Sequence, residues 1–130
     1  MERDDKAPPV LRQLNFEETV AQLLELVGRR TELIVSSPEN VAPVIAVTAV
    51  FLGTSPAQAK LSFLADPDKE TIFARLGSDC QFRIRRRLFE SSIWEEEQAP
   101  WRWSLDVLQV GTRIRLSRPS ADVADEEIAG

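Results

Sequence analysis

Residues 101–117 carry the pattern that decides the fold, and they read WRWSLDVLQVGTRIRLS. Apolar and polar residues alternate on both sides of a short connection at 109–112, as expected for two half-buried strands joined by a hairpin. Residues 81–88, QFRIRRRL, alternate in much the same way. We therefore expect strands in the second half of the chain that turn apolar side chains to a core and arginines to solvent.

One helix is predicted near the N-terminus, over residues 16–27. Asn15 is a good N-cap, and Glu18 three residues later completes a capping box. Gly28 is a natural residue to close the helix. Its apolar stripe, which should face the protein body, consists of Phe16, Val20, Leu23, Leu24 and Val27. Exposed positions are then expected at Glu17, Gln22 and Glu25.

The middle of the chain predicts further strands at 31–36 and 44–52. The second is rich in β-branched residues and apolar on both sides, which is typical of a strand inside a sheet. Residues 57–77 allow two interpretations: a hairpin of 60–65 with 70–76, or two short helices that begin near Ser55 and Asp66. Residues 95–100 are predicted to be a loop.

These elements predict a mainly β (α+β) fold, namely a small antiparallel β-barrel or sandwich of five to seven strands with the N-terminal helix packed on it. Residues 14–118 would form this single barrel-like domain. Residues 1–13 are predicted to be a disordered N-terminal tail and residues 119–130 an acidic disordered C-terminal tail, because neither segment has an apolar period.

Composition favours an ordinary globular protein. Of the 130 residues, 43% are hydrophobic and 28% charged, so a packed core is expected. No apolar run approaches the roughly 18–20 residues that span a bilayer, and we expect no membrane association. The single cysteine, Cys80, cannot form an internal disulfide, which favours a reducing compartment, and we predict the cytoplasm.

The residue types favour a protein that is not an enzyme and that needs no cofactor and no metal. The sequence has no histidine, only one cysteine and no glycine-rich phosphate motif. A carboxylate-only hydrolase is the alternative that these counts leave open. Its candidate carboxylates are Asp66, Asp68, Asp79 and Asp106, although these residue types also build ordinary turns.

Arginines at two-residue spacing mark a candidate basic face. If their strands are neighbours, the side chains would merge into one patch that contacts phosphates, an acidic peptide or the acidic C-terminal tail. They could equally form a solvated sheet face whose arginine stems cover apolar atoms. The candidate residues are Arg83, Arg85, Arg87, Arg102, Arg113 and Arg115.

A second candidate surface is apolar. Trp94 lies beside the predicted loop and is expected to be exposed, so that with Phe89 and Ile93 it would form a contact patch for a partner. Trp101 and Trp103 share the periodicity of Leu105 and are expected in the core.

The function that these observations favour is a non-catalytic binding or scaffold module for protein–protein interaction or self-assembly. A partner protein or a second copy of the chain is the expected partner, because residues 44–52 show no charge that would protect a strand edge. Two alternatives are single-stranded nucleic-acid (RNA) binding through the arginine face, and the carboxylate-only hydrolase.

Overall fold

The structure is a computed structural model that describes residues 9–37, 40–53, 71–98 and 100–129. In chain order its elements are β1 (Val10–Leu14), α1 (Phe16–Glu25), β2 (Arg30–Ser37), β3 (Asn40–Gly53), β4 (Thr71–Leu76), β5 (Cys80–Arg85), the 3-10 turn η1 (Arg86–Leu88), β6 (Phe89–Glu97), β7 (Arg102–Gln109), β8 (Thr112–Ser117) and α3 (Ser120–Ala129). No helix in these ranges is long and apolar enough to cross a membrane.

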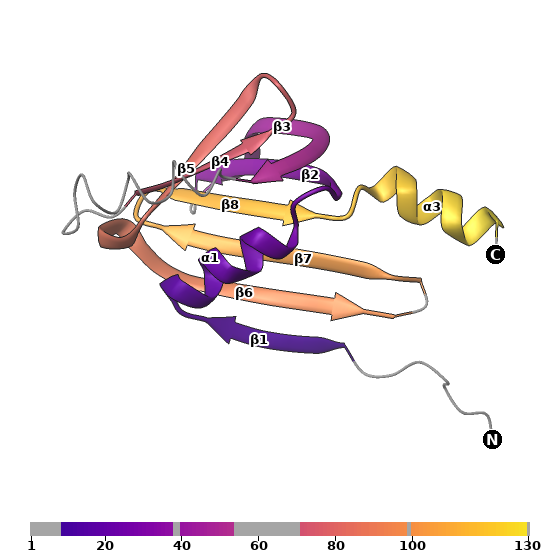
Figure 1. Ribbon diagram of the computed structural model, residues 1–130, viewed down its shortest axis with the longest axis horizontal. Helices are drawn as coiled ribbons and strands as arrows, with labels where there is room; N and C mark the ends of the chain where they lie inside the picture. The colour runs from indigo at the N-terminus through magenta and orange to yellow at the C-terminus, as the bar shows by residue number, and fades with distance from the viewer. Residues whose placement is uncertain (1–8, 38–39, 54–70, 99, 130) are drawn as a thin grey trace.

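The strands form one antiparallel sheet in the order β1-β6-β7-β8-β2-β3-β4-β5 (Figure 1). The prediction of a mainly β fold is confirmed. The finer prediction of a small barrel or sandwich is wrong, since the strands form one open sheet with β1 and β5 at its opposite ends. The strand count of five to seven is also too low: the sheet of the described residues has eight strands.

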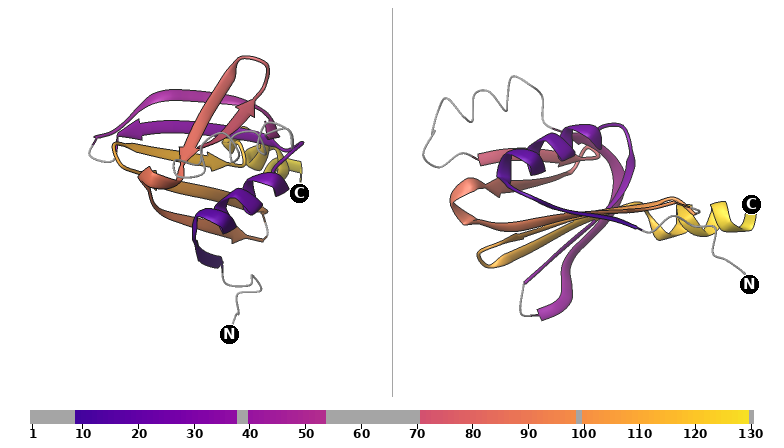
Figure 2. Two further views of the ribbon diagram at one scale, coloured as in Figure 1. Left: turned by 60° about the vertical axis from the view of Figure 1, so that its left-hand side comes forward. Right: turned by 90° about the horizontal axis from the view of Figure 1, so that it is seen from below.

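The sheet is strongly bent, and Figure 2 shows the β4–β5 hairpin lying across the line of the other strands. β4 pairs with β3 only at Phe51 and Gly53, where the register shifts. Gly53 has a φ of +72°, and a Cβ there would lie 2.5 Å from Cγ2 of Val27. The bend therefore needs a residue without a side chain at this point.

The core lies between α1 and one side of the sheet, here called the inner face. The alternation predicted for the last two strands is confirmed, because every second residue of β7 and β8 is buried on that face. These buried residues are Trp103, Leu105, Val107, Gln109, Ile114 and Leu116. The opposite side of β6, β7, β8 and β2 is the outer face.

The start of α1 follows the prediction. The backbone N–H of Glu18 donates to Oδ1 of Asn15 at 2.7 Å, and the Asn15 N–H donates to Oε1 of Glu18 at 2.9 Å. These two bonds complete the capping box and satisfy two N–H groups at the start of the helix.

The buried side of α1 differs from the predicted stripe. Leu24 and Val27 are 54% and 49% exposed, whereas Leu26 and the polar Gln22 are buried. The glutamine is tolerated because Nη2 of Arg12 donates to its Oε1 at 3.2 Å. The buried side of α1 is thus shifted by about one residue from the predicted stripe. The contact of Gln22 with Arg12 of β1 accompanies this shift, and sequence periodicity contains no information on that contact.

Both predicted tails contain secondary structure. Residues 10–14 form β1, which pairs with β6 from Val10↔Glu96 to Leu14↔Ser92. Residues 120–129 form α3, in which Val123 is buried. Short charged strands are common at sheet edges, and this composition is what made the first segment resemble a tail.

Two further segments differ from expectation. Glu95, Glu96 and Glu97, predicted to be a loop, complete β6 and pair with Ser104, Trp103 and Arg102 of β7. Residues 71–76 are a strand, which excludes the two-helix interpretation for that part of 57–77. The other half of the predicted hairpin, residues 60–65, lies outside the described residues.

Candidate binding surfaces

The strand order divides the predicted basic face. Arg83 and Arg85 lie on β5, whereas Arg113 and Arg115 lie on β8, and the strands β2, β3 and β4 stand between them in the sheet. Strand β7, with Arg102, is a neighbour of β8. The structure therefore brings Arg102, Arg113 and Arg115 to the outer face and separates the β5 pair from them.

Arg87 is not on the β5 face at all. Strand β5 ends at Arg85, and residues 86–88 form η1, so the two-residue alternation stops before Arg87. The neighbouring Arg86 explains the turn, since its guanidinium forms an ion pair with Glu17 and lies 4.4 Å from the ring centroid of Phe16 on α1. The run of three arginines thus serves partly to attach β5 to the helix.

Arg113 has an acidic partner on the adjacent strand. Its Nε and Nη2 donate to the two carboxylate oxygens of Asp106 at 3.0 and 2.6 Å. This pair of hydrogen bonds raises the pKa of the Arg113 guanidinium. Asp106 is therefore engaged in sheet stabilisation, and its charge offsets that of Arg113 on the outer face.

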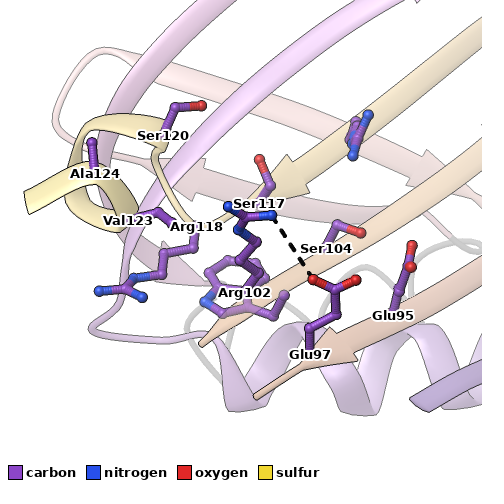
Figure 3. Close-up of a pocket in the computed structure, with 11 residues that line it drawn as sticks. Glu95, Glu97, Arg102, Ser104, Ser117, Arg118, Ser120, Val123 and Ala124 are labelled. Atoms are coloured by element: carbon purple, nitrogen blue, oxygen red, sulfur yellow. Dashed lines mark ion pairs between the residues drawn. The ribbon is translucent and has the colours of Figure 1, made fainter. Parts of the chain in front are cut away.

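A polar hollow of about 430 Å³ lies on the outer face beside α3 (Figure 3). We call it the outer hollow. Arg102 and Arg115 line it together with Glu95 and Glu97, and Nη1 of Arg102 lies 4.0 Å from Oε1 of Glu97. Figure 3 shows Val123 and Ala124 of α3 at one side. Arg118 lines the hollow as well, so three arginines and two glutamates share it and neither sign of charge is alone there.

A second cavity, the inner groove, has about 300 Å³ and a mostly apolar lining. It opens between β5 and the ends of β2, β3 and β8. Its apolar floor consists of Leu33, Val35, Ile45, Phe82, Leu88 and Ile114. Arg83 and Arg85 line it as well, and neither forms an ion pair with the described acidic residues.

Gln109 closes one end of the inner groove. It lies in the segment predicted to be a short connection and was not among the predicted site residues. Its Oε1 accepts the Arg85 backbone N–H at 2.8 Å, and its Nε2 donates to the Arg83 carbonyl at 3.2 Å. The sequence could have indicated its inward position, because Gln109 continues the alternating inner series of Trp103, Leu105 and Val107. A polar residue in a buried series needs partners of this kind.

The predicted apolar contact patch does not form. Trp94 is only 5% exposed and stacks on Trp103 with ring centroids 5.8 Å apart. Phe89 packs edge-on against Phe16, and only Ile93 turns to the outer face. The reason is that Trp94 lies within β6 and not beside a loop, so the strand places it on the inner face.

The tryptophans offer no free stacking platform either. Trp103 is buried, and the guanidiniums of Arg29 and Arg118 lie 5.2 and 5.6 Å from the ring centroid of Trp101. The Trp101 indole N–H donates to Oε2 of Glu96 at 2.8 Å. These cation–π contacts and this hydrogen bond fix the ring at the end of the sheet.

The remaining candidate groups lie apart. Asp79 is exposed in the turn before β5, Asp106 pairs with Arg113, and Asp66 and Asp68 lie outside the described residues. Cys80 is half-buried and lines the inner groove, and burial raises the pKa of its thiol. A raised pKa lowers the fraction of reactive thiolate.

Strand β3 has an open edge. Along one edge it pairs with β2 from Arg30↔Val50 to Ser37↔Asn40, but along the other it pairs with β4 only at Phe51 and Gly53. No strand of the described residues lies against the second edge at 45–49, and the next residue on this edge, Val50, accepts the Gly77 backbone N–H at 2.8 Å. Figure 2 shows the β2–β3 hairpin extending away from α1.

Comparison with known proteins finds no family model, no curated protein and no solved structure that matches this chain.

Proposed function

We propose that this protein is a non-catalytic interaction module that associates with a second copy of itself through the open edge of β3. The observation that carries the proposal is the pairing of this strand. This 14-residue strand pairs with β2 along one edge, while the other edge at 45–49 has no strand against it among the described residues. Such an edge presents backbone N–H and C=O groups in the spacing that another strand requires.

The absence of charge on β3 favours a second copy as the occupant. Residues 40–53 read NVAPVIAVTAVFLG and contain no Asp, Glu, Lys or Arg. Edge strands are usually protected by charged side chains, which in a symmetric pair would face their own copies and repel. Because β3 carries none, two copies can align antiparallel about a two-fold axis without that repulsion.

The exposed side chains of β3 support the same arrangement. Ala46, Thr48 and Val50 are exposed, and so is Leu52, with 43% exposure at Val50 and 46% at Leu52. In pairing centred on Thr48, Val47 of one copy lies opposite Ala49 of the other and the two Thr48 residues meet, while the Val50 carbonyl keeps its bond from Gly77. These small and β-branched residues suit cross-strand contact.

The expected association is weak and reversible. A single pair of short strand edges buries less than the roughly 1,200 Å² of a standard interface, which is the range of transient complexes. We place the module in the cytoplasm, where Cys80, which is a free thiol, would stay reduced.

The substitution T48K tests the proposal. Thr48 lies opposite Glu32 of β2, so a lysine there gains an opposite charge within its own copy and the fold is retained. In the proposed pair, by contrast, two like charges meet at the centre. Sedimentation velocity at about 10–500 µM should show concentration-dependent dimer for the unchanged chain and monomer for T48K.

The matched control is V110K, which adds the same charge in the β7–β8 turn, where Val110 is exposed. It should dimerise like the unchanged chain. An equimolar mixture of T48K and T48E should dimerise again, because opposite charges then meet. A T48K protein that dimerises as well as V110K would refute the proposal.

A further inference from the structure

We propose that the inner groove binds a small amphipathic anion, namely a carboxylate with an unbranched apolar chain of about eight carbons. The groove lies between β5 and the ends of β2, β3 and β8, and the proposal does not depend on self-association through β3. It names a ligand-binding function in addition to the interaction proposed above.

The floor of the groove requires an apolar occupant. Its six apolar residues come from five different elements, β2, β3, β5, η1 and β8, and Ile45 remains 44% exposed. Water in contact with this floor can form few hydrogen bonds, so displacing it by a hydrocarbon chain is favourable. A mostly apolar cleft with a few polar groups is the usual form of a small-molecule site.

The basic side of the groove selects the sign of the head group. Arg83 and Arg85 lie two residues apart on β5, roughly 6–7 Å along the strand. Among the described residues no acidic side chain lines the groove, and neither arginine pairs with a described carboxylate. In a chain of net charge −5, two arginines at the rim of an apolar floor favour an anionic head group.

Gln109 lines one end of the groove, but its side-chain amide does not bind the ligand. Its side-chain oxygen and nitrogen both bond the β5 backbone, so the amide is already satisfied. It therefore holds Arg83 and Arg85 in place at one end of the groove. The head group is left to the guanidiniums and to Thr112, which also lines the cavity.

The outer hollow lacks these properties although it is larger. Arg102, Arg115 and Arg118 share it with Glu95 and Glu97; Arg118 already bonds backbone carbonyls, Arg102 lies near Glu97, and the carboxylates would repel an anion. The two cavities thus differ in charge, and the inner groove is the one suited to a carboxylate.

The volume sets the length of the chain. At about 30 Å³ for each water-sized group, a cavity of about 300 Å³ holds about ten non-hydrogen atoms. Octanoate has that number. A ligand of this size is expected to bind with a dissociation constant on the order of 0.1–1 mM.

Titration of the full chain with octanoate, followed by amide chemical shifts, tests the proposal. Shifts should concentrate on the amides of β5, Thr112 and Ile45 and saturate. In R83Q/R85Q the affinity should fall about tenfold or more, because each guanidinium contributes a charge-assisted contact. The matched control R75Q removes a charge from the exposed Arg75 on β4, outside the groove, and should bind normally.

Two further ligands and one further variant distinguish the contribution of the arginines from that of the apolar floor. Neutral 1-octanol should bind the unchanged chain and R83Q/R85Q equally, whereas butyrate should bind roughly a hundredfold more weakly than octanoate because it leaves the floor uncovered. The floor variant I45S should weaken octanoate without affecting the arginines. Equal octanoate affinity in R83Q/R85Q and R75Q would overturn the proposal, as would the absence of saturable shifts at about 10 mM. Binding of an acidic peptide in place of octanoate would also overturn it.

Discussion

The side-chain amide of Gln109 takes the place of a neighbouring strand for Arg85. It accepts the Arg85 N–H at 2.8 Å and donates to the carbonyl of Arg83 at 3.2 Å, which is the donor and acceptor pattern that a paired backbone would supply. Strand β5 is at the end of the sheet, and this one residue attaches part of its edge to the β7–β8 hairpin.

Replacing this amide should destabilise the fold. Q109A removes two hydrogen bonds and leaves a part-buried N–H and C=O unpaired, so the free energy of unfolding should fall by about 2 kcal/mol. Q109E keeps the acceptor but buries a carboxylate whose second oxygen faces the Arg83 carbonyl, and should cost at least as much. Urea unfolding measures both, with V110A at the adjacent exposed position as the control. Equal stability of Q109A and V110A would contradict the role assigned to Gln109.

The Q109A variant should also change the reactivity of Cys80, which lines the same groove. In the unchanged chain burial raises the pKa of this thiol, so its reaction with a disulfide reagent at pH 8 should be slower than that of a free cysteine. Because Q109A loosens β5, the reaction rate of Cys80 in this variant should approach that of a free cysteine. The rate is measured with the chain still folded in the absence of urea, and V110A should react like the unchanged chain.

The position of Trp94 leads to a prediction about stability. Because the ring is buried and stacked on Trp103, W94A should lower the free energy of unfolding by about 3–5 kcal/mol. The adjacent Ile93 is 41% exposed on the outer face, and I93A should cost less than about 1 kcal/mol. Urea unfolding followed by circular dichroism compares the two. Similar losses from the two substitutions would show that Trp94 is not in the core.

Acid should weaken the attachment of α1 through Glu17. The hydrogen bond from Arg86 lowers the pKa of the Glu17 carboxyl below its ordinary value of 4.5. A depressed pKa in the folded state means that the stabilisation is complete above about pH 5 and is lost as the pH falls through the folded value. The melting temperature of the unchanged chain should therefore fall more steeply below about pH 4.5 than that of E17Q.

The control for this pH dependence is E25Q, which alters an exposed glutamate of the same helix outside the contact with Arg86. The melting temperature of E25Q should fall below about pH 4.5 as steeply as that of the unchanged chain. If E17Q and the unchanged chain lose stability in parallel, the Glu17–Arg86 pair does not contribute to acid unfolding.

The capping box gives a fifth prediction. N15A should lower the free energy of unfolding by about 1 kcal/mol, because the Glu18 N–H loses its acceptor at the first turn. N15D should retain most of the stability, since aspartate is an equally good cap and suits the helix dipole. Far-ultraviolet circular dichroism during urea unfolding measures both variants.

The sequence predicted those parts of the fold that depend on local patterns. The alternation from Trp103 to Leu116 places strand residues on the correct faces, and the pair Asn15 and Glu18 fixes the start of α1. Both signals act within a few residues, so a single sequence contains them. Sequence composition failed at β1 and at the end of β6, where charged residues belong to strands because they lie on an exposed edge or face.

The candidate sites depended on relations that no local pattern contains. Whether the arginines of β5 and β8 meet depends on the strand order and on the bend of the sheet: Arg113 and Arg115 turn to the outer face, whereas Arg83 and Arg85 line the inner groove. The burial of Gln22 depends in the same way on Arg12 of another element. Charge patterns in the sequence therefore identified the residues but not their grouping.

The junction of β4 with β3 at only two residue pairs has a consequence for the native-state motions of the molecule. Separating the β4–β5 ribbon from the other strands breaks few backbone hydrogen bonds, and the five-strand block from β1 through β2 keeps all of its own pairs. Amide protons of Cys80–Arg85 should then exchange through local opening, faster than those at the centre of β7. The width of the inner groove is thereby set by the ribbon and can adjust while the rest of the sheet stays folded.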